Sequence, residues 1–338
     1  MGFAKGTGLP EGCGRYKGNL HSHTTASDGC LTPEESAAAF RAHGYSFLCQ
    51  SEHDVFTDRR AELDADDFIL LPGLEASTYL MGPDGPDGRP RALACHHLLG
   101  ILGTAEMQAA APRRFEHGER LEPPRAHGTW DGAAAAQAVV DELAAHGCFA
   151  LYNHPIWSRV GERDFAGTQG LSGLEIFNYN TVNECGEGAD TTYWDAMLRR
   201  GVRINCFASD DNHNGGVFDD AFGGWIVACA PELSHDAIVR AIMAGEYYSS
   251  SGPEIVNYGV QDGVAWVACS PCERITMIAG GFIGASGTKI AAPGAELERA
   301  TFPLRGGETY LRFECRDAAG RTAWTNPLYA EPRPAAND

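Results

Sequence analysis

Short apolar runs alternate with helix-like segments over roughly the first 250 residues of the chain. This alternation predicts a mainly parallel β-sheet with helices packed outside it. About seven strand–helix units within ~240 residues favour a closed α/β barrel over an open sheet. The predicted strands cover residues 17–21, 46–50, 68–72, 93–101, 148–152, 173–177, 204–208 and 223–229.

The helices are marked by their ends. The segment 32–44 begins with Thr32 as a cap and has Pro33 in the first position and Glu35 in the capping-box position. It closes at Gly44, and an alanine-rich helix over 131–147 closes at Gly147 in the same way. Two further segments, 189–201 and 233–245, also have a helical pattern.

Two stretches interrupt this rhythm. Residues 81–91 are rich in Gly, Pro and Asp and predict a loop. Residues 104–130 have little periodicity, and a loop of this length is usually functional or mobile. Because it follows the strand 93–101, we expect it on the face of the barrel where the strands end. Its arginines, Arg113, Arg114, Arg120 and Arg125, could help to hold an anion, although a solvated loop is favoured for most of them.

The pattern changes after Pro253. Short strand-like runs are joined by glycine-containing turns, and no segment has a convincing helical pattern. This predicts a small β-sandwich over 253–332, behind a catalytic domain over 15–252. A packing or interface role is favoured for the β-domain over a chemical one. The last residues form a polar tail.

The composition of the chain limits the classes of partner that it is expected to bind. The 338 residues carry 26 basic and 45 acidic side chains, giving a net charge of −19. Such a surface repels duplex nucleic acid and anionic membranes, so neither is expected as a partner. The N-terminus has no apolar signal region, and a cytoplasmic location is expected. The 11 cysteines are then mostly reduced core residues; Cys269 and Cys272 form one CxxC without a second ligand pair, which disfavours a metal site there.

Histidines and carboxylates gather where predicted strands end. A lone histidine or acid at such a position is usually a hydrogen-bonded or solvated residue. In a parallel barrel, however, these ends converge on one mouth, and so many charges would be costly there unless cations bind between them. The candidates are His21, His23, Asp28, His53, Glu75, His96, His97, His154, Asp210, Asp211 and His213.

The ligand types limit the metal. Imidazole with carboxylate suits Zn, Mn or Fe, and the absence of cysteine from the set argues against a structural thiolate site. Residues i and i+2 of a strand share a face, so His21 and His23 can bind one ion together, and Asp211 and His213 repeat this spacing. Such a cluster is expected to hold two or three divalent ions, with one carboxylate bridging.

The chain resembles the PHP (polymerase and histidinol phosphatase) superfamily of metal-dependent phosphoesterases over roughly residues 15–250. The resemblance rests on "NLHSHTTASDGCLTPEE", "GYSFLCQSEHD", "LLPGLEAS", "HHLLG", "YNHP" and "ASDDNH", in this order. It implies a distorted (β/α)7 barrel with two or three metal ions in its mouth. It also implies three ligand sets: His21 and His23 with bridging Glu75 and Asp211; Asp28, His53 and His213; and His97 and His154 with Glu75. If the third site is empty, His97 and His154 would contact the phosphate instead.

Some positions depart from the family pattern. His97 is preferred over its neighbour His96 because it directly precedes "LLG", as in the family, but His96 is an alternative. Glu52 stands where the family has Asp, and we expect it to orient ligands by hydrogen bonding. Of the two aspartates in "SDDNH", Asp211 fits the spacing to His213, which leaves Asp210 a supporting role.

The whole chain further resembles the carbaryl-hydrolase-like branch of the family, through "YKGNLHSHT", "YYSSSGPEI" and "AWTNPLY". Our first hypothesis is a phosphoesterase in which a metal-activated hydroxide attacks a small phosphate mono- or diester, with His97 or His154 protonating the leaving group. Arg159 is a candidate phosphate clamp, weighed evenly against a surface arginine. The alternatives are an ester, carbamate or amide hydrolase and, less favoured, a module without catalysis. The substrate is then a small molecule, and the oligomeric state is open.

Overall fold

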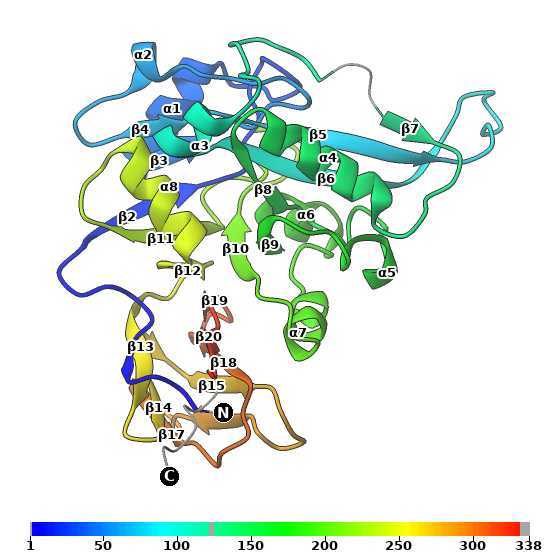
Figure 1. Cartoon of the computed structure of the whole chain (residues 1–338). Helices are drawn as coiled ribbons and strands as arrows, with labels where there is room; N and C mark the ends of the chain where they lie inside the picture. The colour runs from blue at the N-terminus through cyan, green and yellow to red at the C-terminus, as the bar shows by residue number, and fades with distance from the viewer. Residues whose placement is uncertain (1, 122–124, 332–338) are drawn as a thin grey trace.

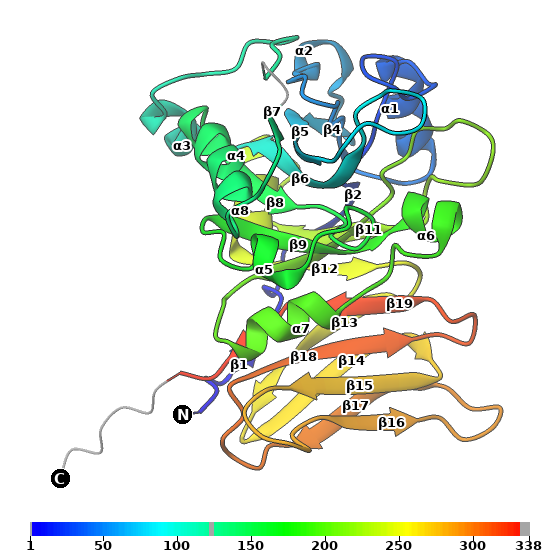
Figure 2. The ribbon, with the colours of Figure 1, turned by 90° about the vertical axis from the view of Figure 1, so that its right-hand side faces the viewer.

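The computed structural model describes residues 2–121 and 125–331 and has a mixed α/β architecture. Figures 1 and 2 show an upper part built of strands and helices above a lower part built of strands. The chain starts and ends in the lower part, so the N-terminal residues pack with the C-terminal strands before the chain enters the upper part.

One sheet of the upper part has six strands in the order β10-β9-β8-β6-β5-β7. Strands β8, β9 and β10 are parallel, whereas β5 and β6 form an antiparallel hairpin and β6 also pairs antiparallel with β8. The prediction of a mainly parallel sheet is therefore wrong at β6, which pairs antiparallel with both of its neighbours, because the loop 82–91 turns the chain straight back. The other pairs of this sheet are parallel. The bounds are β5 (Gly73–Met81), β6 (Ala92–Leu102), β7 (Arg125–His127), β8 (Cys148–Tyr152), β9 (Leu171–Asn178) and β10 (Asn205–Ser209).

A second sheet runs from the upper into the lower part, in the order β4-β3-β2-β11-β12-β19-β18-β15-β16, with β20 also pairing with β18. Strands β2, β3 and β4 are parallel, and the remaining pairs are antiparallel. Its bounds are β2 (Gly14–Asn19), β3 (Phe47–Cys49), β4 (Ile69–Leu71), β11 (Trp225–Ala230), β12 (Tyr247–Ser250), β15 (Arg274–Ala279), β16 (Gly287–Ile290), β18 (Tyr310–Arg316), β19 (Thr322–Thr325) and β20 (Leu328–Tyr329).

The third sheet has four antiparallel strands, β1 (Gly6–Thr7), β13 (Ile255–Gln261), β14 (Val264–Cys272) and β17 (Leu297–Pro303). It shares one buried apolar cluster with β15, β18 and β19, which includes Tyr258, Phe302 and Phe313. Because β12 pairs with β19, the second sheet continues across the predicted domain boundary at residue 253. That boundary and the separate β-sandwich therefore stay predictions.

Most helices lie on the outside of the upper part, whereas α7 lies lower, beside β18 and β19 (Figures 1 and 2). The predicted cap of the first one is present: Thr32 accepts a hydrogen bond from the backbone N–H of Glu35, whose side chain accepts one from Thr32. The bounds are α1 (Pro33–Ala42), α2 (Arg60–Leu63), α3 (Ala105–Ala110), α4 (Ala134–Ala145), α5 (Glu162–Phe165), α6 (Tyr179–Cys185), α7 (Thr192–Arg199) and α8 (His235–Ala244).

Two isolated bridges bring the upper sheets together at the ends of their strands. Ser22, after β2, bridges Asn212, after β10, and His53, after β3, bridges Glu75 on β5. Both bridges lie outside the regular strand pairing, so the described strands form separate sheets and the closed seven-stranded barrel stays a prediction. The bridges matter for chemistry because they join the segments that carry the histidines.

The segment 104–130 was expected on the face where the strands end, next to the histidines, but it does not begin there. Strand β6 runs antiparallel to β8, and its last residues face the start of β8, where Gly103 donates to the carbonyl of Gly147. His154, by contrast, follows the end of β8. The segment therefore starts at the opposite end of the sheet from His154, and Arg113 on it pairs with Glu142. Residues 122–124 lie outside the described residues.

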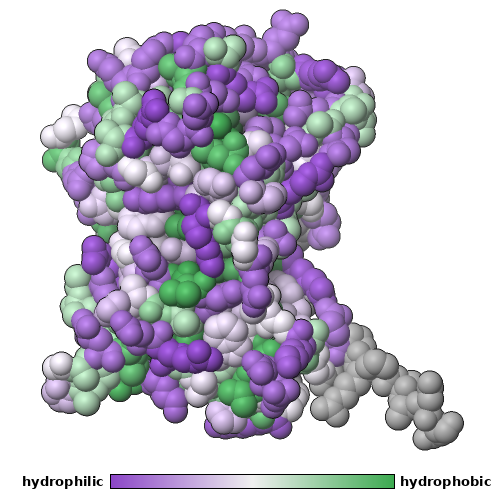
Figure 3. Space-filling view, turned by 90° about the vertical axis from the view of Figure 1, so that its left-hand side faces the viewer, coloured by the Kyte–Doolittle hydropathy of each residue, from purple (hydrophilic) through white to green (hydrophobic). Residues whose placement is uncertain are grey.

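The surface contains few large apolar side chains. The face in Figure 3 is mostly hydrophilic, with apolar residues in small separate groups. Within residues 2–121 and 125–331, no helix combines the length and the apolar character needed to span a bilayer.

Candidate metal centre

His21 and His23 follow the end of β2 and are both fully buried. Their backbone is held by the neighbouring segment: Asp211 donates to the carbonyl of His21, and His23 donates to the carbonyl of Asn212. The turn that follows folds back closely, because a Cβ on Gly29 would lie 2.4 Å from the carbonyl oxygen of His23. This turn carries Asp28 back toward the two histidines.

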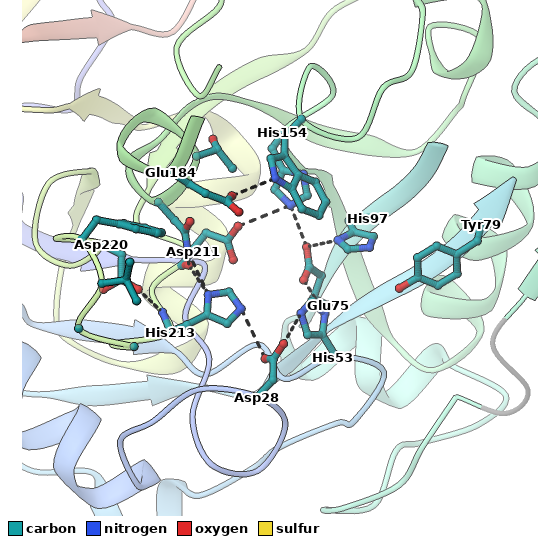
Figure 4. Close-up of a pocket in the computed structure, with 17 residues that line it drawn as sticks. Asp28, His53, Glu75, Tyr79, His97, His154, Glu184, Asp211, His213 and Asp220 are labelled. Carbon is teal, nitrogen blue, oxygen red and sulfur yellow. Dashed lines mark hydrogen bonds and ion pairs between the residues drawn. The ribbon is translucent and has the colours of Figure 1, made fainter. Parts of the chain in front are cut away.

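Glu75 lies at the centre of the cluster and is fully buried on β5 (Figure 4). Its Oε1 lies 3.1 Å from Nε2 of His21, 3.1 Å from Nδ1 of His97 and 3.2 Å from Nε2 of His154. Its Oε2 lies 2.9 Å from Nδ1 of His53 and 3.5 Å from Nε2 of His23. The two oxygens of one carboxylate thus face different sets of histidines.

Asp211 completes the buried half of the site. Its Oδ1 lies 3.0 Å from Nε2 of His21 and 2.9 Å from Nε2 of His23. Asp211 follows the end of β10 and has a φ of +55°, so it no longer alternates with its neighbours as a strand residue would. It therefore faces His21 and His23, whereas His213 faces Asp28, and the predicted shared face for Asp211 and His213 is wrong.

The outer half of the site is more accessible. Asp28 is half exposed, and its carboxylate lies 3.5 Å from Nε2 of His53 and 3.4 Å from Nε2 of His213. The rings of His53 and His213 both stack against His23, with centroids 4.3 and 4.4 Å from it and 6.1 Å from each other. His23 therefore connects the buried half and the outer half.

Within residues 2–121 and 125–331, four groups of ligand atoms lie close enough together to hold an ion: His23, Asp28, His53, His213; His21, His23, Glu75, Asp211; His21, His154, Glu175; and His53, Glu75, His97. The first two contain the predicted ligand sets. The predicted third set, His97 and His154 with Glu75, is divided between the other two groups, although both histidines contact Glu75.

Sequence reasoning missed Glu175 on β9. Its Oε1 lies 3.2 Å from Nδ1 of His21, and its Oε2 accepts hydrogen bonds from the backbone of His154 and from Asn178. The hydroxyl of Ser209 also donates to it. A signal was present in "SGLEIFN", where a single acid interrupts an apolar run, since a buried carboxylate needs partners.

The residues fit divalent cations. Among the described residues, several buried polar atoms of the cluster form no well-aligned hydrogen bond: Nε2 of His21, Nδ1 of His23, Nδ1 of His53, Oε2 of Glu75 and Nε2 of His97. Leaving such atoms unpaired is costly in a buried site, and a cation coordinated by them would satisfy several at once. The donors are imidazole nitrogens and carboxylate oxygens, which suit Zn, Mn or Fe.

The charges of the cluster are strongly coupled. Burial alone would lower the pKa of His21, but Asp211, Glu75 and Glu175 outweigh burial and raise that pKa well above its usual value. Burial would raise the pKa of Glu75, but His21, His97 and His53 hold it well below its usual value. Burial lowers the pKa of His23 to about 4, against the hydrogen bond to Asp211. Burial would also raise the pKa of Asp211, but His21 and His23 hold it well below its usual value. Glu75 and Asp211 are therefore ionised and available as ligands.

The two adjacent histidines of β6 point to opposite faces, as strand geometry requires. His97 contacts Glu75, whereas His96 lies in the core, where its Nδ1 is 2.5 Å from the hydroxyl of Tyr152 and its ring stacks on Trp130. Burial lowers the pKa of His96 to about 4. The structure thus brings His97 to the cluster and leaves His96 outside it.

Glu52 and Asp210 support the loops around the site rather than its histidines. Glu52 accepts hydrogen bonds from the backbone and hydroxyl of Thr24 and from the hydroxyl of Ser27, and so fixes the turn that carries Asp28. Asp210 accepts the backbone N–H groups of Phe222, Gly223 and Gly224. Burial raises the pKa of Asp210 to about 7, against these three hydrogen bonds.

Arg159 is not brought into the cluster. Its guanidinium is largely exposed and forms an ion pair with Glu187, with Nη1 at 2.9 Å from Oε1. A cavity of about 570 Å³ opens above the cluster, and Arg159 does not line it. The lining includes Tyr79, Trp157, Asn180, Thr181, Glu184, Asp220 and the loop 215–218, together with most of the outer ligands (Figure 4). Among the described residues, none that lines this cavity is Lys or Arg.

Comparison with known proteins gives distant likenesses. No protein-family model matches the chain. Over 146 residues the chain is 28% identical to a 5'-3' exoribonuclease of Haemophilus influenzae, which covers 40% of this chain and 50% of that protein. The match therefore spans about half the length of this relative.

Several solved structures are similar to the chain, and three of them illustrate the likeness. A two-domain protein from Bacteroides vulgatus containing a predicted PHP-like metal-dependent phosphoesterase is 12% identical, covers 94% of both chains and has a TM-score of 0.45. A protein from Bifidobacterium adolescentis described as a metal-dependent phosphoesterase is 15% identical over 67% of this chain and 95% of that one, with a TM-score of 0.40. An amidohydrolase from Chromobacterium violaceum is 17% identical over 68% and 96%, with a TM-score of 0.41. None of these proteins is described as carbaryl-hydrolase-like, so that branch stays a prediction.

Proposed function

We propose that the chain is a metal-dependent hydrolase of the PHP type that cleaves a small phosphate mono- or diester. One observation carries the proposal: the two oxygens of Glu75 face different histidine sets in one buried cluster. A carboxylate in this position can bridge neighbouring ions, which is the arrangement used to hold both oxygens of a phosphoryl transfer. The proposal includes a distorted seven-stranded barrel joined at the two isolated bridges, with residues after 253 as an accessory β-domain.

In this proposal, two ions have defined ligands. His21, His23, Glu75 and Asp211 would hold the first, and Asp28, His53 and His213, with His23 between the two, the second. A third ion would be bound beside Glu75, by His97 and His154 with Glu175 behind. Divalent Mn, Zn or Fe in these positions lowers the pKa of water and neutralises charge that develops on a phosphoryl group.

The chain's own side chains then orient the reacting groups. Where no third ion is bound, His97 and His154, which both line the cavity and stand next to Glu75, are each placed to deliver a proton to the leaving group. His154 is oriented by Ser158, whose hydroxyl lies 3.0 Å from Nδ1, and by the bond from its backbone to Glu175. Arg159 would take part as a phosphate clamp only after leaving Glu187.

A second candidate function is hydrolysis of an ester, carbamate or amide. It is favoured by the absence of Lys and Arg from the described lining of the cavity, because a carbonyl substrate needs no cationic side chain. A module without catalysis is disfavoured, since all nine expected ligand positions hold residues able to bind metal.

The purified protein, loaded in turn with Mn, Zn or Fe, distinguishes these functions. We expect turnover of p-nitrophenyl phosphate or bis-p-nitrophenyl phosphate, and loss of that turnover in a Glu75→Ala variant. Turnover of p-nitrophenyl acetate alone, with both phosphates inert under every metal, would reject the phosphoesterase and support the second candidate.

A further inference from the structure

The wall of the cavity beside His97 and His154 is aromatic. The indole of Trp157 stands edge-to-face to His154, with ring centroids 5.1 Å apart, and 5.9 Å from the ring of His97. Tyr79 lies on the other side of His97, with centroids 5.9 Å apart. A leaving group protonated by either histidine would therefore lie against the ring of Trp157.

An acid is attached to this aromatic wall. The Nε1–H of Trp157 donates a hydrogen bond to Oε2 of Glu184, at 3.2 Å. Glu184 comes from α6 and lines the cavity on the same side as Asp211 and His154 (Figure 4). Within the described part of the chain, Glu184 forms no ion pair, so no side-chain cation cancels its charge.

The rest of the lining offers no compensation for a second anion. Asp28, Glu75, Asp211 and Asp220 also line the cavity, and no described lining residue is Lys or Arg. Cations bound by the histidine cluster would attract one anionic group to the floor of the cavity. A second anionic group, on the leaving group, would lie near Glu184 with no cation to meet it.

We propose that Glu184, held by Trp157, makes the site select esters whose leaving group carries no negative charge. The proposal rests on the hydrolase function proposed above and names the substrate class of the same cavity. Glu184 is itself exposed, so water weakens its field, but like charges brought together at a binding site are a common way to exclude a wrong substrate. The volume of about 570 Å³ is sufficient for a leaving group of the size of an aromatic ring.

The test compares three esters that differ in the charge of the para substituent: phenyl phosphate, which has no such substituent, 4-carboxyphenyl phosphate and 4-(aminomethyl)phenyl phosphate. For the metal-loaded protein, we expect kcat/KM for the carboxylated ester to be at least about tenfold below that for phenyl phosphate, a difference of about 1.4 kcal/mol. The aminomethyl ester should match or exceed phenyl phosphate. The Glu184→Gln variant should reduce the selectivity ratio at least about threefold, and Glu184→Lys should reduce it further.

A matched control is Glu232→Gln. Glu232 is also an exposed glutamate that accepts one hydrogen bond, from Ser234, but it does not line the cavity. Its variant should keep the wild-type ratio. Trp157→Phe, which keeps an aromatic ring but cannot donate to Glu184, should reduce the ratio in the same direction as Glu184→Gln.

Equal turnover of the neutral and the carboxylated ester by the wild-type protein would overturn the proposal, and so would an unchanged ratio in Glu184→Gln. The same three leaving groups are measured as acetates. If the acetates alone turn over, the phosphoesterase function is wrong, while the charge selectivity is still decided by the acetate ratio. Inertness toward both series under every metal would overturn both.

Discussion

Oε1 of Glu175 lies 3.2 Å from Nδ1 of His21, on the side of the ring opposite to Glu75 and Asp211. A carboxylate in this position fixes the tautomer of the imidazole, so that Nε2 is free to bind a metal ion. We predict that Glu175→Gln keeps the fold but weakens the affinity for the most tightly bound ion by about 10–100-fold. Competition with a chelator measures the change.

The control for this variant is Glu232→Gln, since Glu232 is exposed, does not line the cavity and belongs to none of the ligand groups. It should bind metal like the wild type. If Glu175→Gln bound its ions as tightly as the control, Glu175 would not orient His21.

We expect replacement of the two adjacent histidines of β6 to have different effects, one on activity and the other on stability. His97→Ala removes a side chain that contacts Glu75, so we expect a loss of activity of at least about 100-fold with little change in stability. His96→Ala removes a core side chain stacked on Trp130, which should cost about 1–3 kcal/mol while the metal content stays unchanged. Turnover, elemental analysis and urea unfolding of both variants measure activity, metal content and stability. A loss of activity in His96→Ala and a loss of stability alone in His97→Ala would mean that His96 is the functional residue.

Glu52 should affect the second ion more than the first. Its three hydrogen bonds hold Thr24 and Ser27 in the turn before Asp28, and Asp28 belongs only to the outer ligand group. We predict that Glu52→Gln lowers the affinity for the weaker-bound ion about tenfold and leaves the tighter one nearly unchanged. Metal titration followed by calorimetry resolves the binding of the tighter ion from that of the weaker ion. Glu62→Gln, which changes an exposed glutamate, is the control. An equal effect on both steps would argue against a local role.

Much of this site follows from the sequence, because its ligands occupy the ends of apolar runs that are easily recognised. The strand β8 and the capped helix α1 lie where the pattern predicts them. The pattern does not predict the hairpin of β5 and β6, because it places Glu75 after the strand 68–72, whereas Glu75 lies inside β5. Periodicity alone does not set the direction of a strand, so the antiparallel pairing and the starting point of the segment 104–130 were also missed. The distant partners of Glu175 and the left-handed backbone of Asp211 depend on tertiary contacts that no local pattern contains.

Helix α7 lies beside β18 of the second sheet (Figure 2), and a buried arginine connects the two. Arg312 on β18 is fully buried, binds both carboxylate oxygens of Asp195 and lies over the ring of Trp194. Removing one member of a buried ion pair leaves the other uncompensated, so Arg312→Ala should lower the free energy of unfolding by about 3–5 kcal/mol. On the same strand, exposed Arg316 lies 3.9 Å from Glu273, and Arg316→Ala should cost less than about 1 kcal/mol. Urea unfolding measures both, and equal costs would contradict this account of Arg312.

Metal removal should destabilise the protein more at higher pH. Without bound ions, the raised pKa of His21 and of His97 comes from ion pairs with carboxylates, chiefly Asp211 and Glu75, that outweigh burial. This contribution is fully present below the unfolded-state pKa of about 6.5 and is lost as the pH rises through the folded-state values. Metal binding displaces the same protons, so its affinity also rises with pH. The increase in Tm on metal addition should therefore grow between about pH 6 and pH 8; an increase that shrinks over this range would contradict the pairing.

The central claim is that Glu75 joins neighbouring metal ions in one cluster, and the number of ions per chain tests it most directly. After loading with Mn, Zn or Fe and removal of free metal, elemental analysis should give two or three ions per wild-type chain. The Glu75→Ala variant should lose at least one of them while keeping its fold by circular dichroism. Fewer than two ions per wild-type chain, or an unchanged metal content in Glu75→Ala, would contradict the account.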